Sequence, residues 1–351
     1  MPRSLGRLIL LVAAALLAAC GRPEPWRTES YVFGTRVELA IAGPSAEQAR
    51  KAADKVLRDF DVLHRTYHAW QPSELSALNA DIAAGRSREV SAEFADYIRE
   101  AQAVAAAGDH LFDPGVGRLI ALWGFHSDDI RPALPDEAAL KALIAQKPSI
   151  ADLQIEGNRV SSRNRAVALD FGGYLKGVAL DRAVASLKAD GIANALVNIG
   201  GNVMALGSRD GEGTPWRIGI QHPRPQSVGG MPLASLELRD GEALGTSGDY
   251  HRYFEVGGRR YCHLLDPRSG FPAEGTQAVT LLVGPGSKTG MRSDALSKPI
   301  FIAGKAWRAM ATKLGVAAVL RVDGDGAVSA TPAMQARIRS EVPDLKIAVW
   351  P

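Results

Sequence analysis

The order of strand-like and helix-like segments constrains the fold of this chain more than any other feature. Apolar residues alternate with polar ones along residues 31–42, whereas residues 45–67 place them at helical spacing behind Ser45, a good N-cap. Further along, strand patterns come in runs separated by glycine turns, without a regular βαβ alternation. This order predicts an α+β fold with mixed, largely antiparallel sheets and packed helices, rather than a doubly wound sheet.

The individual elements follow from the same patterns. Helices are expected over residues 45–67, 73–79, 91–107, 136–145, 177–190, 293–303 and 305–314, with a short apolar helix inside 112–124. Strands are expected over residues 31–42 (interrupted at 33–35), 153–155, 167–170, 195–199, 203–206, 217–221, 233–238, 242–245, 252–256, 260–264, 277–283 and 317–322. The turn at residues 156–158 should begin a hairpin between strands 153–155 and 167–170. These elements would fill one large domain or two intimate ones.

The first twenty residues have the pattern of an export signal. Arg3 and Arg7 precede an apolar run, residues 8–17, that is too short to be a comfortable membrane-spanning helix. Residues 17–20 have the sequence Leu-Ala-Ala-Cys, which is typical of a lipoprotein cleavage site before Cys20. Several acyl chains on Cys20 would anchor the protein stably in a membrane. The alternative is an ordinary secretory signal with a cysteine there by chance.

The N-terminal pattern therefore predicts both a domain division and a location. We expect a lipoprotein signal peptide over residues 1–19, the lipidated cysteine and its tether over 20–29, and the folded domain over 30–345. The protein would be exported and lipid-anchored to a bacterial membrane, facing the periplasm. Gly21, rather than an aspartate, follows Cys20. This favours the outer membrane over the inner one if the host has both.

Charge and cysteine content argue against two classes of protein. Without Arg3 and Arg7, the 41 basic side chains fall to 39 against 38 acidic ones, so the body is nearly neutral. No basic stripe with interleaved aromatic residues is present, which argues against a nucleic-acid partner. Cys262 has no intramolecular partner once Cys20 is acylated, so the fold must rely on its core rather than on a disulfide. We expect Cys262 to be a buried thiol rather than a nucleophile.

Two glycine turns are candidates for ligand contacts. Residues 169–177 combine a strand end, the glycine pair at Gly172 and a helix start, and Lys176 adds a positive charge. Glycines admit close backbone approach, and a helix N-terminus attracts phosphate groups. The alternative is a tight strand-to-helix turn that simply needs glycine. Taken alone, the second turn, residues 198–202, is better explained as a hairpin.

The segment after residue 245 is dense in groups that can handle a phosphate ester. Residues 246–250 offer two hydroxyls and a carboxylate on one turn, and His263 follows. Strand alternation places Asp266 on the face opposite His263, so the two are not automatically partners. His263 is either structural or a proton acceptor. Asp294 and Lys298, four residues apart, form either an ion pair on one helix face or a cation site beside a phosphate.

Taken together, these segments resemble the ApbE family, the FAD:protein FMN transferases, in the same order over most of the chain. The matching segments are residues 33–35, 73–79, 112–114, 123–125, 170–177, 181–182, 197–201, 246–250, 263–272 and 294–297. The resemblance implies an ApbE-like fold whose two intimate subdomains hold the site between them. It also implies an activity, in which FMN moves from FAD to a threonine hydroxyl of an exported flavoprotein and AMP is released.

The resemblance also implies roles for single residues. His263 matches the histidine that acts as general base. The FAD pocket would be formed by Phe33, Trp70, Leu111, Phe112, Asp113, Gly172, Lys176, Val178, Thr246, Ser247, Asp249 and Leu265. A magnesium ion would be held by Asp294 and residue 298, with Ser297 beside them and the backbone carbonyl of Leu175 as a further ligand.

Position 298 departs from the family pattern, because Lys298 stands where the family has a threonine. Magnesium prefers oxygen ligands, and an ammonium group offers none. Two outcomes stay open. Either Lys298 takes the place of the cation, pairs with Asp294 and neutralises the diphosphate itself, or the site is weakened and the protein binds FAD without efficient transfer.

These observations predict a membrane-anchored FMN transferase that uses FAD, with reduced or altered dependence on Mg2+. Its acceptor would be an exported flavoprotein that carries the target threonine. Two other functions remain possible on this sequence. One is a non-catalytic FAD-binding lipoprotein that serves the assembly of a redox complex, and the other is an FAD pyrophosphatase that releases FMN and AMP.

Overall fold

The computed structural model describes residues 24–350, except for the side chains of Ser227 and Val228. Cys20, the expected lipidation site, and the predicted signal peptide lie outside the described residues. Among the helices of residues 24–350, none is both long enough and apolar enough to cross a membrane.

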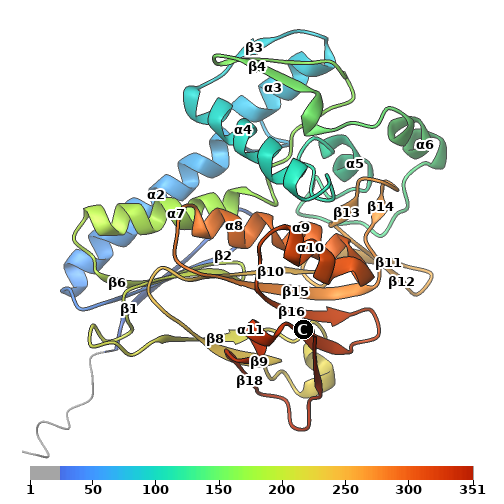
Figure 1. Ribbon diagram of the computed structural model, residues 1–351. Helices are drawn as coiled ribbons and strands as arrows, with labels where there is room; N and C mark the ends of the chain where they lie inside the picture. Colours follow the sequence, from blue (N-terminus) through green and yellow to red (C-terminus); the bar gives the residue numbers. More distant parts are fainter. Residues whose placement is uncertain (1–23, 351) are drawn as a thin grey trace, which may run out of the picture.

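A nine-stranded sheet forms the centre of the molecule (Figure 1). Its strands, in spatial order, are β1 (Trp26–Val32), β2 (Thr35–Ala42), β6 (Asn194–Ile199), β7 (Asn202–Leu206), β10 (Ala243–Gly248), β15 (Thr276–Val283), β16 (Ala318–Asp323), β17 (Val328–Ala330) and β19 (Ile347–Val349). Every neighbouring pair is antiparallel except β17 and β19. The largely antiparallel α+β fold expected from the sequence is therefore confirmed.

Helices cover one face of this sheet (Figure 1). They are α2 (Ala46–Thr66), α7 (Leu175–Ala189), α8 (Thr289–Ala295), α9 (Ser297–Ile302) and α10 (Trp307–Lys313). The opposite face carries a small sheet of β18 (Ile338–Ser340), β9 (Ala234–Leu238) and β8 (Trp216–Ile220), together with α11 (Pro332–Gln335). The central sheet is therefore buried on both faces.

A second group of elements lies beyond the helical layer (Figure 1). It contains α3 (Glu74–Ala83), α4 (Ala92–Ala107), α5 (Gly117–Leu122), α6 (Glu137–Ala145) and the sheet of β3 (Arg88–Glu89), β5 (Arg159–Ser162) and β4 (Leu153–Glu156). Two hairpins, β11 (Tyr253–Val256) with β12 (Arg259–Cys262) and β13 (Leu265–Asp266) with β14 (Phe271–Pro272), lie beside it. Short 3-10 turns occupy Ile150–Asp152, Pro225–Val228 and Gly304–Ala306.

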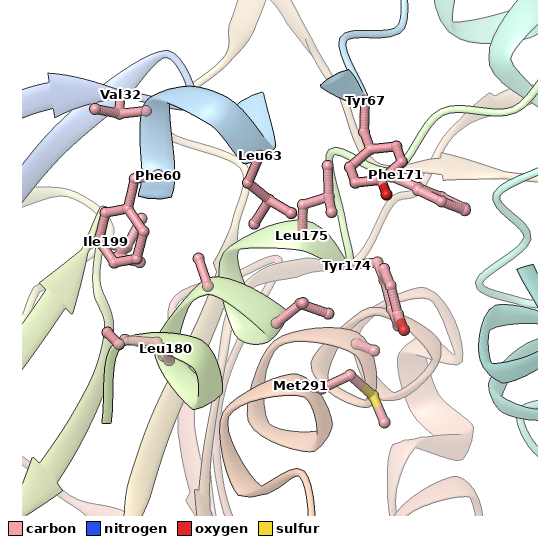
Figure 2. Close-up of a cluster of buried hydrophobic side chains, with 14 of the residues drawn as sticks. Val32, Phe60, Leu63, Tyr67, Phe171, Tyr174, Leu175, Leu180, Ile199 and Met291 are labelled. Carbon is pink, nitrogen blue, oxygen red and sulfur yellow. The ribbon is translucent and has the colours of Figure 1, made fainter. Parts of the chain in front are cut away.

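The alternating pattern of β2 explains how the sheet is buried on both faces. Val37, Leu39 and Ile41 enter the core under the helices, whereas Ala40 and Ala42 enter the core on the other side. Figure 2 shows the first core, where Phe60 and Leu63 of α2 pack near Leu175 and Leu180 of α7 and Met291 of α8. This packing fixes α7 and α8 against each other and against the sheet.

Several predicted elements need correction. Residues 167–170 do not form a regular strand, because Ala168 makes only an isolated bridge to Val116, and β4 pairs with Arg159–Ser162 instead. The helix expected over 293–303 is two helices, which meet at Leu296. The expected tether ends early, since β1 already begins at Trp26, and β19 extends the fold beyond residue 345.

Candidate functional site

A cleft of about 340 Å³ lies where the helical layer, the central sheet and the second group of elements meet. Twelve of the residues expected at the site line it: Phe33, Trp70, Leu111, Phe112, Asp113, Gly172, Lys176, Thr246, Ser247, His263, Leu265 and Lys298. They come from seven separate segments of the chain, so folding brings together residues that are far apart in the sequence. The position of the cleft agrees with a site between two intimate subdomains.

His263 lies in the short connection between β12 and β13 and faces this cleft. Its Nδ1 is 3.1 Å from the backbone oxygen of Arg252. A carbonyl oxygen can only accept a hydrogen bond, so Nδ1 carries the proton and Nε2 is left as an acceptor. Burial, together with the positive charges of Lys176 and Arg252, lowers the pKa of His263 to about 3. The imidazole is therefore a neutral base at neutral pH.

Asp266 is not the partner of His263. Its carboxylate accepts hydrogen bonds from the guanidinium and the backbone N–H of Arg268, at 2.9 Å and 3.0 Å from one of its oxygens. The strand expected over residues 260–264 ends at Cys262, so strand alternation does not explain the separation, although the two residues are not partners. The ring of His263 is oriented by a backbone carbonyl instead.

The turn before α7 is held by Asp170. One carboxylate oxygen accepts a hydrogen bond from the backbone N–H of Gly172 at 2.7 Å, and the other lies 2.9 Å from Nε2 of His126. Burial alone would raise the pKa of Asp170, but these contacts outweigh it and lower the pKa. Lys176 donates to the backbone oxygen of Gly172 at 2.8 Å and so also faces the cleft.

Asp294 on α8 is completely buried beneath the cleft floor. Its Oδ2 accepts from the backbone N–H of Gly177 at 2.9 Å, and its Oδ1 accepts from the side-chain amide of Asn202 at 3.1 Å. Lys298 donates both to Oδ1 and, at 2.7 Å, to the backbone oxygen of Asp294. Burial would raise the pKa of Asp294, but Lys176 and Lys298 lower it. This carboxylate therefore carries its charge inside the protein.

The approach of α7 to α8 depends on Gly177. A Cβ atom there would lie 2.5 Å from the backbone oxygen of Gly290 and 2.8 Å from Cβ of Asp294. Gly177 is also in the first turn of α7, where backbone N–H groups have no intrahelical acceptor. Asp294 supplies that acceptor from another helix. The backbone N–H group of Gly177, at the helix start that was predicted to bind phosphate, therefore already donates a hydrogen bond to Asp294.

Five residues of the predicted site do not line the cleft. Val178 and the side chain of Leu175 pack in the core under the helices. Asp249 is held by the guanidinium of Arg224 at 2.7 Å and 2.8 Å. Asp294 lies below the cleft floor, and the hydroxyl of Ser297 lies 2.7 Å from that of Ser247. These residues support the cleft from behind.

Sequence reasoning missed three residues that help to build the cleft. Arg252 lines it and donates to the carbonyls of Phe125 and Ser127, both at 2.8 Å, which ties that loop to β11. His251 lines it beside Arg252. His126 stacks on Trp70 with ring centroids 5.0 Å apart. The position of His251 and Arg252, directly after the hydroxyl-rich segment 246–250, was the signal available in the sequence.

Comparison with known proteins gives a consistent result. The model of the ApbE family matches residues 33–320. The FAD:protein FMN transferase of Rhodobacter capsulatus is 42% identical over 345 residues, which cover 96% of this chain and 64% of that protein. Two solved structures are also similar. The ApbE protein of Thermotoga maritima has a TM-score of 0.80 at 31% identity and covers 90% of this chain and 100% of its own. The flavinyl transferase ApbE of Pseudomonas stutzeri has a TM-score of 0.76 at 28% identity and covers 91% and 98%.

Proposed function

The chain belongs to the ApbE family, and from this premise we propose that it is an FAD:protein FMN transferase. It moves FMN from FAD to a threonine hydroxyl of a partner flavoprotein and releases AMP. The observation that best supports the proposal is the position of His263 and the hydrogen bond of its ring. Its Nδ1 is tied to the Arg252 carbonyl, and its Nε2 is left as a proton acceptor in the same cleft as Lys176, Lys298 and the glycine turn.

The reaction needs an in-line hydroxyl, a base for its proton and positive charge near the phosphoryl oxygens. The threonine oxygen of the acceptor attacks the phosphorus atom of the FMN half, and its proton passes to Nε2 of His263. A new P–O bond forms as the P–O bond to the AMP half breaks, and AMP leaves as the anion. His263 is unprotonated at neutral pH, so the lone pair of its Nε2 is available for this proton.

The walls of the cleft suit a planar ring system and the diphosphate of FAD. Phe33, Trp70 and Phe112 offer aromatic faces to a planar ring system. Trp70 is already oriented by stacking on His126, whose ring nitrogen is fixed by Asp170. The diphosphate would lie near Lys176 and the backbone of Gly172 and Gly173, where positive charge and exposed backbone meet.

The magnesium ion implied by the family pattern does not fit the residues present. Both carboxylate oxygens of Asp294 already accept hydrogen bonds, and one of their donors is the ammonium of Lys298. That ammonium supplies no oxygen and would repel a divalent cation beside it. Within residues 24–350, no group of three or more His, Cys, Asp or Glu side chains could hold a metal ion. No step of the reaction is therefore assigned to a metal.

The location and the acceptor are part of the same proposal. The lipoprotein-type sequence before Cys20 supports an exported enzyme, anchored by lipid on Cys20 and facing the periplasm. An enzyme in that place acts on exported flavoproteins that carry a target threonine. Growth with labelled palmitate, followed by purification of the wild type and of Cys20→Ala, tests the anchor. An unlabelled wild type would contradict it.

The activity is tested by incubating the purified chain with FAD and a flavoprotein acceptor, with the acceptor's Thr→Ala variant as control. Covalent FMN on the acceptor, detected by in-gel fluorescence and intact mass, supports the proposal. Intact FAD retained on the protein would indicate a binding protein, and free FMN with AMP would indicate a pyrophosphatase. We expect His263→Ala to lower transfer roughly 100-fold or more without loss of FAD binding, since general bases contribute about that factor.

A further inference from the structure

We propose that Lys298 is a built-in cation that takes the place of a divalent metal ion at the diphosphate, so that this chain binds FAD without Mg2+. The inference rests on the proposed function, because it concerns the way in which the same cleft holds FAD. The positive charge belongs to the protein itself, because it is on the side chain of Lys298 in α9.

Lys298 is placed where a buried charge needs a strong reason. Its side chain lines the cleft, but only 6% of the residue is exposed. Its stem passes close to the glycine turn, since a Cβ atom on Gly173 would lie 3.2 Å from Cε of Lys298. Lysine is rarely buried without a partner, because removing an ammonium from water is costly. The partner here is Asp294, one helical turn earlier.

The hydrogen bonds of Lys298 leave it able to reach a ligand. An ammonium has three N–H donors. Two are directed at oxygens of Asp294, its Oδ1 and its backbone carbonyl. For the third donor, the described part of the chain supplies no acceptor within hydrogen-bond distance, and the side chain borders the cleft. A phosphate oxygen in the cleft would complete the set.

The charges around Asp294 favour an anion rather than a second cation. Lys176 lies 4.0 Å from Oδ1 of Asp294 and lines the same cleft. Two ammonium groups therefore flank one carboxylate. The net charge of these three groups is one positive charge, and both lysines line the cleft. A diphosphate is attracted to this arrangement. A divalent cation is repelled by both lysines and finds Asp294 already surrounded by Lys298, Asn202 and Gly177.

The test measures FAD affinity rather than turnover. The full chain is freed of flavin and titrated with FAD by flavin fluorescence anisotropy, in EDTA and in Mg2+. We expect the wild-type affinities in the two buffers to agree within about twofold. Lys298→Thr should bind FAD roughly 10–100-fold more weakly in EDTA, the effect of losing one charged hydrogen bond, and Mg2+ should restore part of it. Lys55→Met, which removes an exposed lysine paired with Asp190 on the surface, is the matched control.

Folding damage is separated by a second variant. Replacing Lys298 alone leaves a buried carboxylate without its cation, so Asp294→Asn with Lys298→Met removes both charges together. Asparagine has one acceptor oxygen where Asp294 has two, so this double variant should unfold at a somewhat lower temperature but still in one cooperative transition, while FAD affinity falls by the same order as in Lys298→Thr. If the wild type lost FAD binding in EDTA and regained it in Mg2+, the inference would be overturned, but the proposed transferase function would stand. The same holds if the double variant bound FAD as tightly as the wild type. A wild type that binds no FAD in either buffer would contradict the proposed function as well.

Discussion

Gly177→Ala tests whether the close contact of α7 and α8 is essential to the site. The added methyl group would lie 2.5 Å from the Gly290 oxygen and 2.6 Å from the Cα atom of Met291, both of them backbone atoms. Neither can move aside as a flexible side chain would, so the two helices must separate. Separation stretches the bond of 2.9 Å between the Gly177 N–H group and Asp294.

The size of the effect follows from these contacts. Overpacking costs about 1–3 kcal/mol, and the loss of a hydrogen bond to a charged group costs about 1.5–3 kcal/mol. Alanine regains roughly 1 kcal/mol over glycine inside a helix. We therefore expect the free energy of unfolding to fall by about 2–4 kcal/mol. The FAD affinity should fall as well, because Asp294 then loses its position under Lys298.

Urea unfolding followed by circular dichroism measures the change in the free energy of unfolding. Gly286→Ala is the matched control, because its Cβ atom meets nothing within 4 Å. That control should alter stability by no more than about 1 kcal/mol. If Gly177→Ala unfolded at the same urea concentration as Gly286→Ala, the argument that backbone contact fixes α7 against α8 would be wrong.

Four further predictions concern His263, Trp70 and Cys262. Burial and nearby cations lower the pKa of His263 to about 3, so protonation of this residue should not lower kcat/KM between pH 8 and pH 5. A loss of kcat/KM near pH 6.5 that disappears in His263→Gln would refute this. Because of the same pKa shift, this histidine is protonated below pH 6.5 in the unfolded chain but stays neutral in the folded chain. The free energy of unfolding should therefore decrease as the pH is lowered from 7 to 5, and it should decrease less in His263→Gln. Urea unfolding at the two pH values measures the difference. Trp70→Ala should weaken FAD binding about 2–10-fold in a fluorescence titration, the usual worth of one aromatic pair, and an unchanged affinity would exclude stacking on Trp70. Burial raises the pKa of the Cys262 thiol to about 12, so a maleimide should label it only after unfolding, and rapid labelling of the native protein at pH 7 would contradict its burial.

Local patterns in the sequence were sufficient for most of the elements. The Ser45 cap predicted the start of α2 correctly, and its side chain accepts from the backbone N–H of Gln48 as a cap should. The strand predicted at residues 167–170 was wrong for a physical reason. Its backbone groups bond to a loop, since Ala168 pairs with Gly115 and Gly117, so its apolar residues mark burial rather than a regular strand.

The site was predictable where its residues cluster along the chain and was missed where they do not. Thr246, Ser247 and His263 stand in one segment rich in functional groups, and all three line the cleft. Asp249 stands in the same segment but turns away to Arg224, because two parallel charged hydrogen bonds from the guanidinium stabilise its carboxylate there. His126 is 44 residues from Asp170, and no local pattern joins them.

The buried Asp294 shows why sequence spacing finds only part of such a site. The spacing of four between Asp294 and Lys298 allowed an ion pair as one of two alternatives, and the ion pair is present. The two other donors to the carboxylate, Gly177 and Asn202, are 117 and 92 residues away. A buried carboxylate is stable only when several donors surround it, and the sequence spacing shows only one of them. Folding supplies them by bringing α7, α8 and β7 to one point, and that convergence places the ammonium of Lys298 at the edge of the cleft.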